Sequence, residues 1–342
     1  MPRARLLLAA ALCLLPLGAP LRAAPADPDA AAVAAVLAAS RSDRAELRAN
    51  AVEAIQHAPD RALPLVQAAL EDPNPGVRFA ALYVAGRQRM TGLAPAVRDL
   101  LAETGEPNPS VRAATVFAAA RLGLTDDAGL SELARYVFDP DPRTRANAVL
   151  LVGELGQPGA ALMLRHAAAR PPGDRHPQID WAILRLAVAE ALAKVGDAPP
   201  DPTAVAPDAA AQTADVGLRS VRAAAYSNFD EVRVLAIQAL GRLEDGAFWG
   251  NLNNFLNPDE PQPIELRLAA AEALGDMGRG GNLLWAVLPA TRSELATVRA
   301  QSAFALGGME QPEARRALAE LLADPEERVR VAAAAAWLEG AR

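Results

Sequence analysis

The residues that most often carry out chemistry in proteins are few in this chain of 342 residues, and they lie far apart in the sequence. The chain has one cysteine, Cys13, and three histidines, His57, His166 and His176. None of the histidines has a neighbouring glutamate, or a second histidine at the spacing that places two metal ligands on one helical face. Neither a serine-nucleophile turn (G-x-S-x-G) nor a phosphate-binding P-loop is present. The sequence therefore predicts no catalytic residue, no metal site and no cofactor, and we expect a protein that is not an enzyme.

The N-terminal residues have the layout of a secretory signal peptide. Two arginines precede an apolar run from Leu6 to Leu15, and Ala24-Pro25-Ala26 fits a small-residue cleavage site. The apolar run is too short to cross a bilayer comfortably. We therefore expect residues 1–26 to be removed and the protein to be periplasmic or secreted, with no membrane insertion afterwards. Retention of the segment as an anchor is the alternative. Cleavage would remove Cys13, so the mature chain would contain no thiol.

The overall composition favours packed helices and argues against a nucleic-acid partner. Hydrophobic residues make up 51% of the chain but aromatic residues only 4%, so small alanine side chains must fill much of the core. Such a core suits closely packed helices better than a β-sandwich. The net charge is −7, and loss of residues 1–26, which contain three arginines and no acid, would make it −10. Since proteins that bind DNA or RNA usually present a basic face, we expect no nucleic-acid partner.

One sequence pattern recurs along almost the whole chain. The stretch DPNPGVRFAALYVAG at residues 72–86 has a close counterpart, DPEERVRVAAAAAWL, at residues 324–338. In both, a turn that contains proline precedes an arginine, and the arginine opens an alanine-rich helical stretch. Arginines of this kind lie 30 to 48 residues apart. They are Arg48, Arg78, Arg112, Arg145, Arg185, Arg233, Arg267, Arg299 and Arg330. Self-similarity at this period predicts a solenoid in which each unit is a pair of helices.

The pattern resembles HEAT repeats, in particular the short HEAT-like repeats of phycobilisome-lyase-type proteins. The matching residues are the D-P-x-x-x-V-R-x-x-A core and the A-L-G ending, over about residues 40–338. The resemblance implies an all-α fold, a right-handed α–α superhelix of about nine units that works as a scaffold. HEAT-repeat metal hydroxylases are recognised by paired His-Glu motifs, and this chain has no His-Glu dipeptide.

Two blocks of HEAT-like repeats are expected, in residues 27–195 and 214–342. Between them, residues 196–213 are rich in proline, alanine and aspartate, which is typical of a mobile linker loop. This loop divides the solenoid into two halves in our interpretation. A partner-binding arm is the alternative interpretation of the same residues.

A polar residue stands six positions before most of the repeated arginines, at the turn between the two helices of a unit. Examples are Asp72, Glu106 and Asp324. A carboxylate at such a turn can accept hydrogen bonds from the first amides of a helix and from a guanidinium group. We therefore expect these residues to form a structural ladder between units.

In HEAT-like solenoids the second helices line the concave face, and positions five and nine after each arginine lie on one stripe of these helices. On two adjacent repeats this stripe contains two aromatic rings and two arginines, which are common anchors of protein interfaces. The candidate partner-binding residues are Asn50, Glu53, Tyr83, Arg87, Phe117, Arg121 and Asn147. We therefore predict a scaffold that binds a protein of unknown identity through its concave face. Three alternatives stay open. Tyr83 and Phe117 could simply pack between helices, the repeats could cradle a small ligand or prosthetic group as an enzyme or enzyme accessory, or the protein could be a purely structural spacer.

Overall fold

The computed structural model of the chain describes residues 23–102, 105–125, 129–170, 177–196 and 208–340. These residues form eighteen α-helices and three short 3₁₀ helices, and they contain no β-strand. The expected all-α solenoid is confirmed, and the helices pair into the nine units that the arginine series predicts. Most of the expected signal peptide, up to residue 22, lies outside the described residues.

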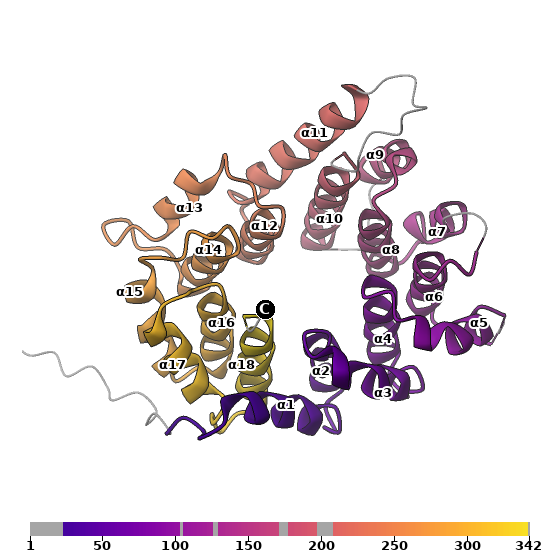
Figure 1. Ribbon diagram of the computed structural model, residues 1–342. Helices are drawn as coiled ribbons and strands as arrows, with labels where there is room; N and C mark the ends of the chain where they lie inside the picture. The colour runs from indigo at the N-terminus through magenta and orange to yellow at the C-terminus, as the bar shows by residue number, and fades with distance from the viewer. Residues whose placement is uncertain (1–22, 103–104, 126–128, 171–176, 197–207, 341–342) are drawn as a thin grey trace, which may run out of the picture.

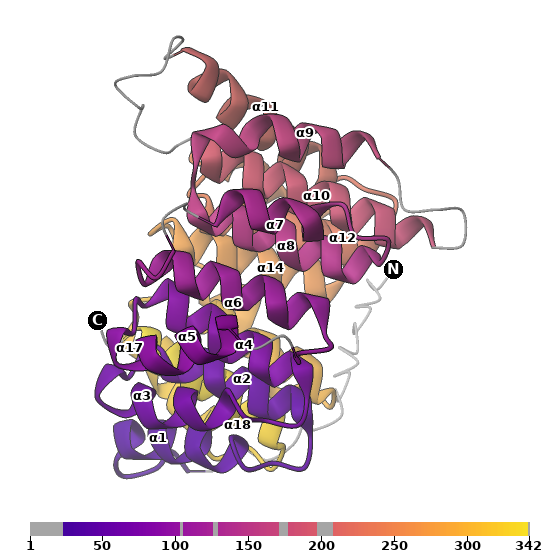
Figure 2. The ribbon, with the colours of Figure 1, turned by 90° about the vertical axis from the view of Figure 1, so that its right-hand side faces the viewer.

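Each unit has an outer and an inner helix, and the inner helices surround the centre of the molecule (Figure 1). The inner helices are α2 (Ala45–Ile55), α4 (Pro75–Arg87), α6 (Pro109–Arg121), α8 (Pro142–Leu155), α10 (Gln178–Gly196), α12 (Asp230–Arg242), α14 (Ile264–Asp276), α16 (Ala296–Gly307) and α18 (Glu327–Glu339). The outer helices are α1 (Pro28–Ala39), α3 (Pro59–Ala69), α5 (Ala94–Ala102), α7 (Leu130–Val137), α9 (Ala161–Ala169), α11 (Asp208–Ala224), α13 (Trp249–Phe255), α15 (Leu284–Val287) and α17 (Pro312–Leu321). Seen from the side, successive units stack on one another (Figure 2). None of the helices in the described ranges combines the length and apolarity needed to cross a bilayer.

Short polar side chains and prolines begin several of the inner helices. Asn74, Asn108 and Asp141 each precede a proline at the first helical position, and their side-chain oxygens accept hydrogen bonds from backbone amides of the first turn. Proline suits this position because the amide it lacks would have no helical partner. The turn residues of the repeat therefore determine where each of these inner helices starts.

A ladder of ion pairs joins successive units, as the spacing of the polar residues predicts. Two guanidinium nitrogens of Arg48 donate to the carboxylate of Asp72 in the next unit at 2.7 and 2.9 Å. The third nitrogen donates to the backbone carbonyl of Ser42 in its own turn at 2.9 Å. The same arrangement recurs in the pairs Arg78–Glu106 and Arg299–Asp324. These three pairs confirm the structural interpretation of the repeated arginines.

The last unit stacks on the first, so the solenoid closes into a ring (Figure 1). Inner helix α18 packs against α2 as a neighbouring unit would, and it also packs against outer helix α1. The indole nitrogen of Trp337 donates to Asp29 at 2.6 Å, and the hydroxyl of Ser42 donates to Glu327 at 3.1 Å. The guanidinium of Arg315 lies 3.8 Å from the centre of the Trp337 ring. Because both ends of the stack are covered, the expected concave face becomes the wall of a central space.

The stack continues across the expected linker. Residues 197–207 lie outside the described residues, but α11 begins at Asp208, so the last six residues of the expected loop, 208–213, are helical. Outer helix α11 packs closely along α10 and also contacts α12. This close approach requires Gly217, because a Cβ atom there would lie 2.5 Å from the backbone nitrogen of Ala193.

Candidate binding site at the centre of the ring

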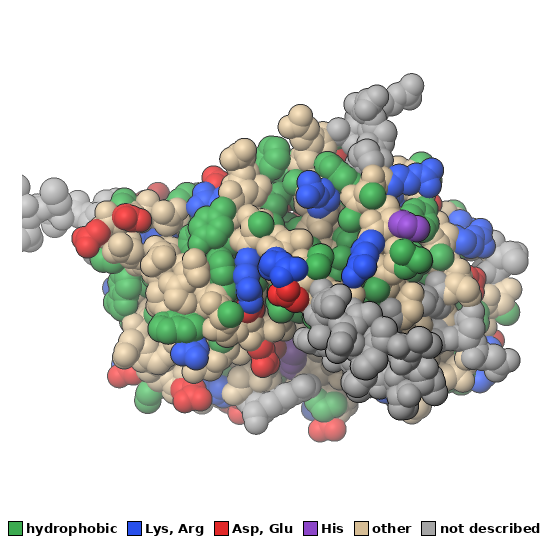
Figure 3. Space-filling view, turned by 90° about the horizontal axis from the view of Figure 1, so that it is seen from above, with side chains coloured by type: hydrophobic (Ala, Val, Ile, Leu, Met, Phe, Trp, Pro, Cys, Tyr) green, Lys and Arg blue, Asp and Glu red, His purple; other side chains and the backbone are tan. Residues whose placement is uncertain are grey.

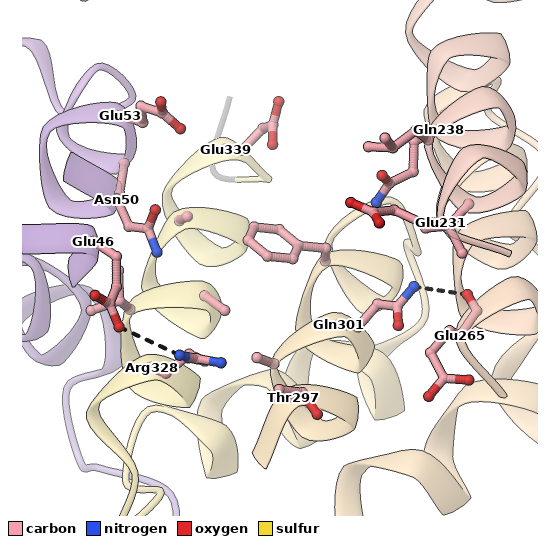
Figure 4. Close-up of a pocket in the computed structure, with 18 of the residues that line it drawn as sticks. Glu46, Asn50, Glu53, Glu231, Gln238, Glu265, Thr297, Gln301, Arg328 and Glu339 are labelled. Atoms are coloured by element: carbon pink, nitrogen blue, oxygen red, sulfur yellow. Dashed lines mark hydrogen bonds and ion pairs between the residues drawn. The ribbon is translucent and has the colours of Figure 1, made fainter. Parts of the chain in front are cut away.

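A pocket of about 990 Å³ lies at the centre of the ring. Its walls come from five inner helices, α2, α12, α14, α16 and α18 (Figure 4). In the close-up, Glu46, Asn50 and Glu53 project from α2, while Glu231 and Gln238 project from α12 on the facing wall. The pocket depends on closure of the ring, since closure brings the first inner helix, α2, beside the last one, α18.

Carboxylates dominate the charged groups of this central pocket. The lining carboxylates are Glu46, Glu53, Asp230, Glu231, Glu265 and Glu339. Among the described residues that line the pocket, Arg328 is the one lysine or arginine, and its guanidinium lies 3.6 Å from Glu46. Phe304 on α16 adds an aromatic ring that is 41% exposed. The pocket therefore combines an excess of negative charge with an exposed apolar surface.

The lining carboxylates fall into two groups, those in the first turn of their helix and those in the last turn. Glu46, Glu231 and Glu265 lie in the first turns of α2, α12 and α14, as does Asp230. The partial positive charge of a helix N-terminus stabilises an acid there, so these four acids help to form the helices. Glu53 and Glu339 lie instead in the last turns of α2 and α18, where the helix dipole disfavours negative charge. Helix stability therefore does not explain these two carboxylates.

Further carboxylates lie beside the pocket on α14. Burial raises the pKa of Glu272 to about 7, although Gln238 donates a hydrogen bond to its carboxylate at 3.0 Å. Burial and the negative charge of Glu339 raise the pKa of Asp276 to about 6. The positive charge of Arg242 opposes both shifts without cancelling them. This part of the ring therefore holds more acid than its own cations balance.

The adjoining part of the inner face, from α8 to α12, carries a network in which acids and bases alternate. Lys194 on α10 lies 2.7 Å from Glu154 on α8 and 3.1 Å from Glu190 on α10. Glu190 in turn accepts two hydrogen bonds from Arg242 on α12, at 3.1 and 2.9 Å. Burial opposes ionisation of Glu190, but the charges of Arg242 and Lys194 outweigh it and hold the pKa of its carboxyl below the usual value. These pairs join α8, α10 and α12 and leave little free charge on this side.

Two of the predicted binding residues line the pocket. Asn50 and Glu53 both do so, and burial raises the pKa of the Glu53 carboxyl while the charge of Arg87 acts against the shift. Arg87 is exposed at the C-terminal end of α4. Burial, with a smaller effect from Glu154, raises the pKa of Tyr83 to about 12. Asn50 and Glu53 therefore face the pocket, Arg87 is exposed outside its lining, and Tyr83 is half-buried; the binding role of these residues stays a prediction.

The other predicted residues mainly join neighbouring units. Phe117 was expected at the binding surface, and this is wrong, because its side chain is fully buried and stacks on Tyr83 with ring centres 5.9 Å apart. The alternative interpretation, packing between helices, holds for this residue. Arg121 is half-buried and donates to the backbone carbonyl of Gly86 at 3.4 Å. The amide of Asn147 donates to the hydroxyl of Ser110 on the neighbouring inner helix at 3.0 Å.

The sequence prediction missed the walls of the pocket that come from the C-terminal half of the chain. Gln238 and Phe304 stand at the fifth position after their arginines, on the same stripe as Glu53. This shared position in the repeat was the sequence signal that could have identified Gln238 and Phe304 as lining residues. It did not show that the C-terminal units face the first unit, since that follows only from closure of the ring.

The histidines are dispersed in the structure as they are in the sequence. His57 lines the pocket just after the end of α2, His166 lies on outer helix α9, and His176 falls outside the described residues. Within the described part of the chain, no three side chains of His, Cys, Asp or Glu are grouped so that they could hold a metal ion.

Comparison with known proteins identifies the repeat. Residues 32–107 and 97–177 match the family model for HEAT repeats, so the chain contains HEAT repeats. A similar solved structure is that of human deoxyhypusine hydroxylase in complex with glycerol, which is 18% identical, with a TM-score of 0.36, over 82% of this chain and 96% of that chain. So weak a likeness carries no argument about function. No curated protein matches the chain.

Proposed function

We propose that this protein is an exported, non-enzymatic scaffold that holds part of a partner protein in its central pocket. The observation that carries the proposal is the convergence of five inner helices on one pocket of about 990 Å³. The HEAT repeats supply a rigid ring, and the pocket supplies the surface for a partner. Export is supported by the apolar run and the small-residue site near the N-terminus.

The lining of the pocket supports binding through many weak contacts. The amides of Asn50 and Gln301 and the hydroxyl of Thr297 offer hydrogen bonds, and Phe304 offers apolar surface. Interfaces of this kind usually combine an aromatic anchor with a polar surround. By contrast, on the face of the ring seen in Figure 3, basic, acidic and apolar side chains are interspersed.

Site-specific photocrosslinking in the native host tests this proposal. A photoreactive phenylalanine analogue would replace Phe304 in the pocket or, as a matched control, Trp285 on outer helix α15. Both side chains are exposed aromatics, at 41% and 50%. We expect a protein adduct from position 304 that is absent from position 285. Adducts from position 285 alone, or none from position 304, would contradict the proposal.

A second candidate function is binding of a small ligand or prosthetic group, as in an accessory protein of the lyase-like HEAT type. The pocket volume favours this candidate, since about 990 Å³ lies near the upper end of the range of roughly 300–1,000 Å³ that is typical of small-molecule sites. A thermal-shift screen of cofactors and metabolites separates the two candidates, because a bound ligand raises apparent stability by mass action.

A further inference from the structure

We propose that the partner segment in the central pocket is an extended basic peptide, whose lysine or arginine side chains pair with the carboxylates of the pocket wall. This inference rests on the proposed function and deepens it by naming the chemistry of the partner. It follows from the charge, the shape and the exposed aromatic ring of the pocket.

The first argument concerns carboxylates that the fold itself does not need. Glu53 and Glu339 line the pocket from α2 and α18, two helices that pack against each other (Figure 4). Both lie in the last turns of their helices, so their negative charges oppose the helix dipoles. A cation bound beside either carboxylate would offset this unfavourable interaction, and the negative potential of the pocket would attract such a cation.

The second argument concerns the cations in and around the pocket, which already interact with acids of the ring. Arg328 pairs with Glu46, and Arg242 makes two hydrogen bonds to Glu190. Arg87 acts on Glu53, but the pKa of that carboxyl stays raised. Glu272 and Asp276, on the same inner stripe of α14, add further negative charge to the region as they ionise. The chain's own cations therefore leave the pocket with an acidic excess.

The third argument concerns the length of the pocket. Its lining on α18 runs from Arg328 to Glu339, which is roughly 16 Å at the helical rise of about 1.5 Å per residue. An extended chain of about five residues covers that length. The lining carboxylates are spread along it, and no three of them among the described residues are grouped as a metal site would be. Spaced cations on an extended chain match this distribution.

The fourth argument concerns Phe304, the exposed ring on α16. A lysine or arginine can place its aliphatic stem or its charged group against an aromatic face, and such contacts strengthen when water is excluded. Among the described residues that line the pocket, Phe304 is the one phenylalanine, tyrosine or tryptophan, and six carboxylates share the lining with it. This combination suits side chains that are apolar along the stem and cationic at the tip.

Fluorescence anisotropy with defined peptides tests the inference. The probe is a labelled hexapeptide in which lysine and arginine alternate with alanine, and the reference is the same peptide with glutamate at the basic positions. We expect the basic peptide to bind, and to bind more weakly as salt is raised. The double variant Glu53→Gln/Glu339→Gln should weaken binding about tenfold or more, and Phe304→Ala about two- to fivefold.

The matched control is Glu132→Gln/Glu313→Gln, which removes two exposed carboxylates from the first turns of outer helices α7 and α17. It makes the same change in net charge outside the pocket and should leave binding nearly unchanged. An equal loss in the two double variants, or equal binding of the acidic peptide, would overturn the inference. Spermidine binding as tightly as the basic peptide would also overturn it, in favour of a small cation. Melting curves of all variants confirm that each is folded.

The photocrosslinking experiment at position 304 separates this inference from the function on which it rests. A protein adduct whose yield is unchanged by Glu53→Gln/Glu339→Gln would contradict the basic peptide and leave the scaffold proposal standing. The absence of any adduct would contradict the scaffold proposal itself.

Discussion

At the scale of single residues, the ladder between units depends on charged groups that are almost removed from water. The side chains of Arg299 and Asp324 are only 6% and 8% exposed, and two hydrogen bonds of 2.8 and 3.0 Å join them. Asp324 also accepts a hydrogen bond from the amide of Glu326 at 2.9 Å and so shapes the turn before α18. The pair therefore links two units and starts a helix at the same time.

Removing one member of this pair should be costly. We expect Asp324→Ala to lower the free energy of unfolding by about 3–5 kcal/mol, because it leaves the Arg299 charge buried without its acidic partner. Glu320→Ala is the control, since its partner Arg316 is 81% exposed, and it should cost less than about 1 kcal/mol. Urea denaturation of both variants measures the difference. Similar losses in the two variants would show that the ladder is not a major source of stability.

The pKa of Glu272 predicts how stability changes with pH. The folded protein raises this pKa from 4.5 to about 7, chiefly by burial, with Asp276 and Glu339 adding to the shift and Gln238 and Arg242 opposing it. Between these two values the folded state holds a proton that the unfolded state has released. The stabilisation is therefore complete below the lower value and is lost as pH rises through the higher one.

The melting temperature of the wild type should accordingly fall between about pH 5 and about pH 8. The variant Glu272→Gln, whose amide does not titrate, should show a smaller fall. Differential scanning fluorimetry across this pH range measures both slopes. Identical slopes in the two proteins would mean that Glu272 does not titrate as its surroundings indicate.

At the scale of elements, the sequence predicts the helix pairs because local chemistry specifies them. The arginine motif recurs with each unit, and prolines and polar caps recur in several of them. Each of these features affects only the few residues around it. The same features predict the ladder, since a ladder needs only the regular spacing of its members. The extent of α11 was missed because its first residues share the alanine and aspartate bias of the proline-rich segment before them.

The candidate site was only partly predictable at this scale. Position five after the arginine places Glu53 in the pocket, but it places Phe117 under the neighbouring helix α4. The cause lies in the preceding unit, where Gly86 leaves the space that the Phe117 ring fills; a Cβ atom on Gly86 would lie 2.6 Å from that ring. The sequence of one helix cannot show whether a side chain at this position lines the pocket or is buried between helices. That outcome depends on the size of the residue it meets on the neighbouring helix.

At the scale of the whole molecule, closure of the ring is the feature that local patterns could not predict. The curvature of a solenoid is the sum of small rotations between units, and a small change in each one decides whether the ends meet. The ends of a solenoid usually need capping units with a polar outer face. Here the first and last units cover each other through α1, α2 and α18. The same contact turns a concave face into a central acidic pocket.

Crosslinking across the junction between the first and last units tests closure most directly. The test pair is Ser42→Cys/Glu327→Cys, where the two native side chains lie 3.1 Å apart. Ser110→Cys/Asn147→Cys is the control, because these side chains lie 3.0 Å apart in neighbouring units and stay close in an open or a closed solenoid. Both pairs would be placed in a Cys13→Ala background, which removes the chain's only native thiol.

In dilute protein treated with a short bis-maleimide, a closed ring predicts that both pairs form intramolecular crosslinks at similar rates. Peptide mass spectrometry of the monomer band identifies each product. Efficient crosslinking of the control pair with none between positions 42 and 327 would show an open solenoid in solution. That result would contradict the ring and, with it, the pocket on which the proposed function depends.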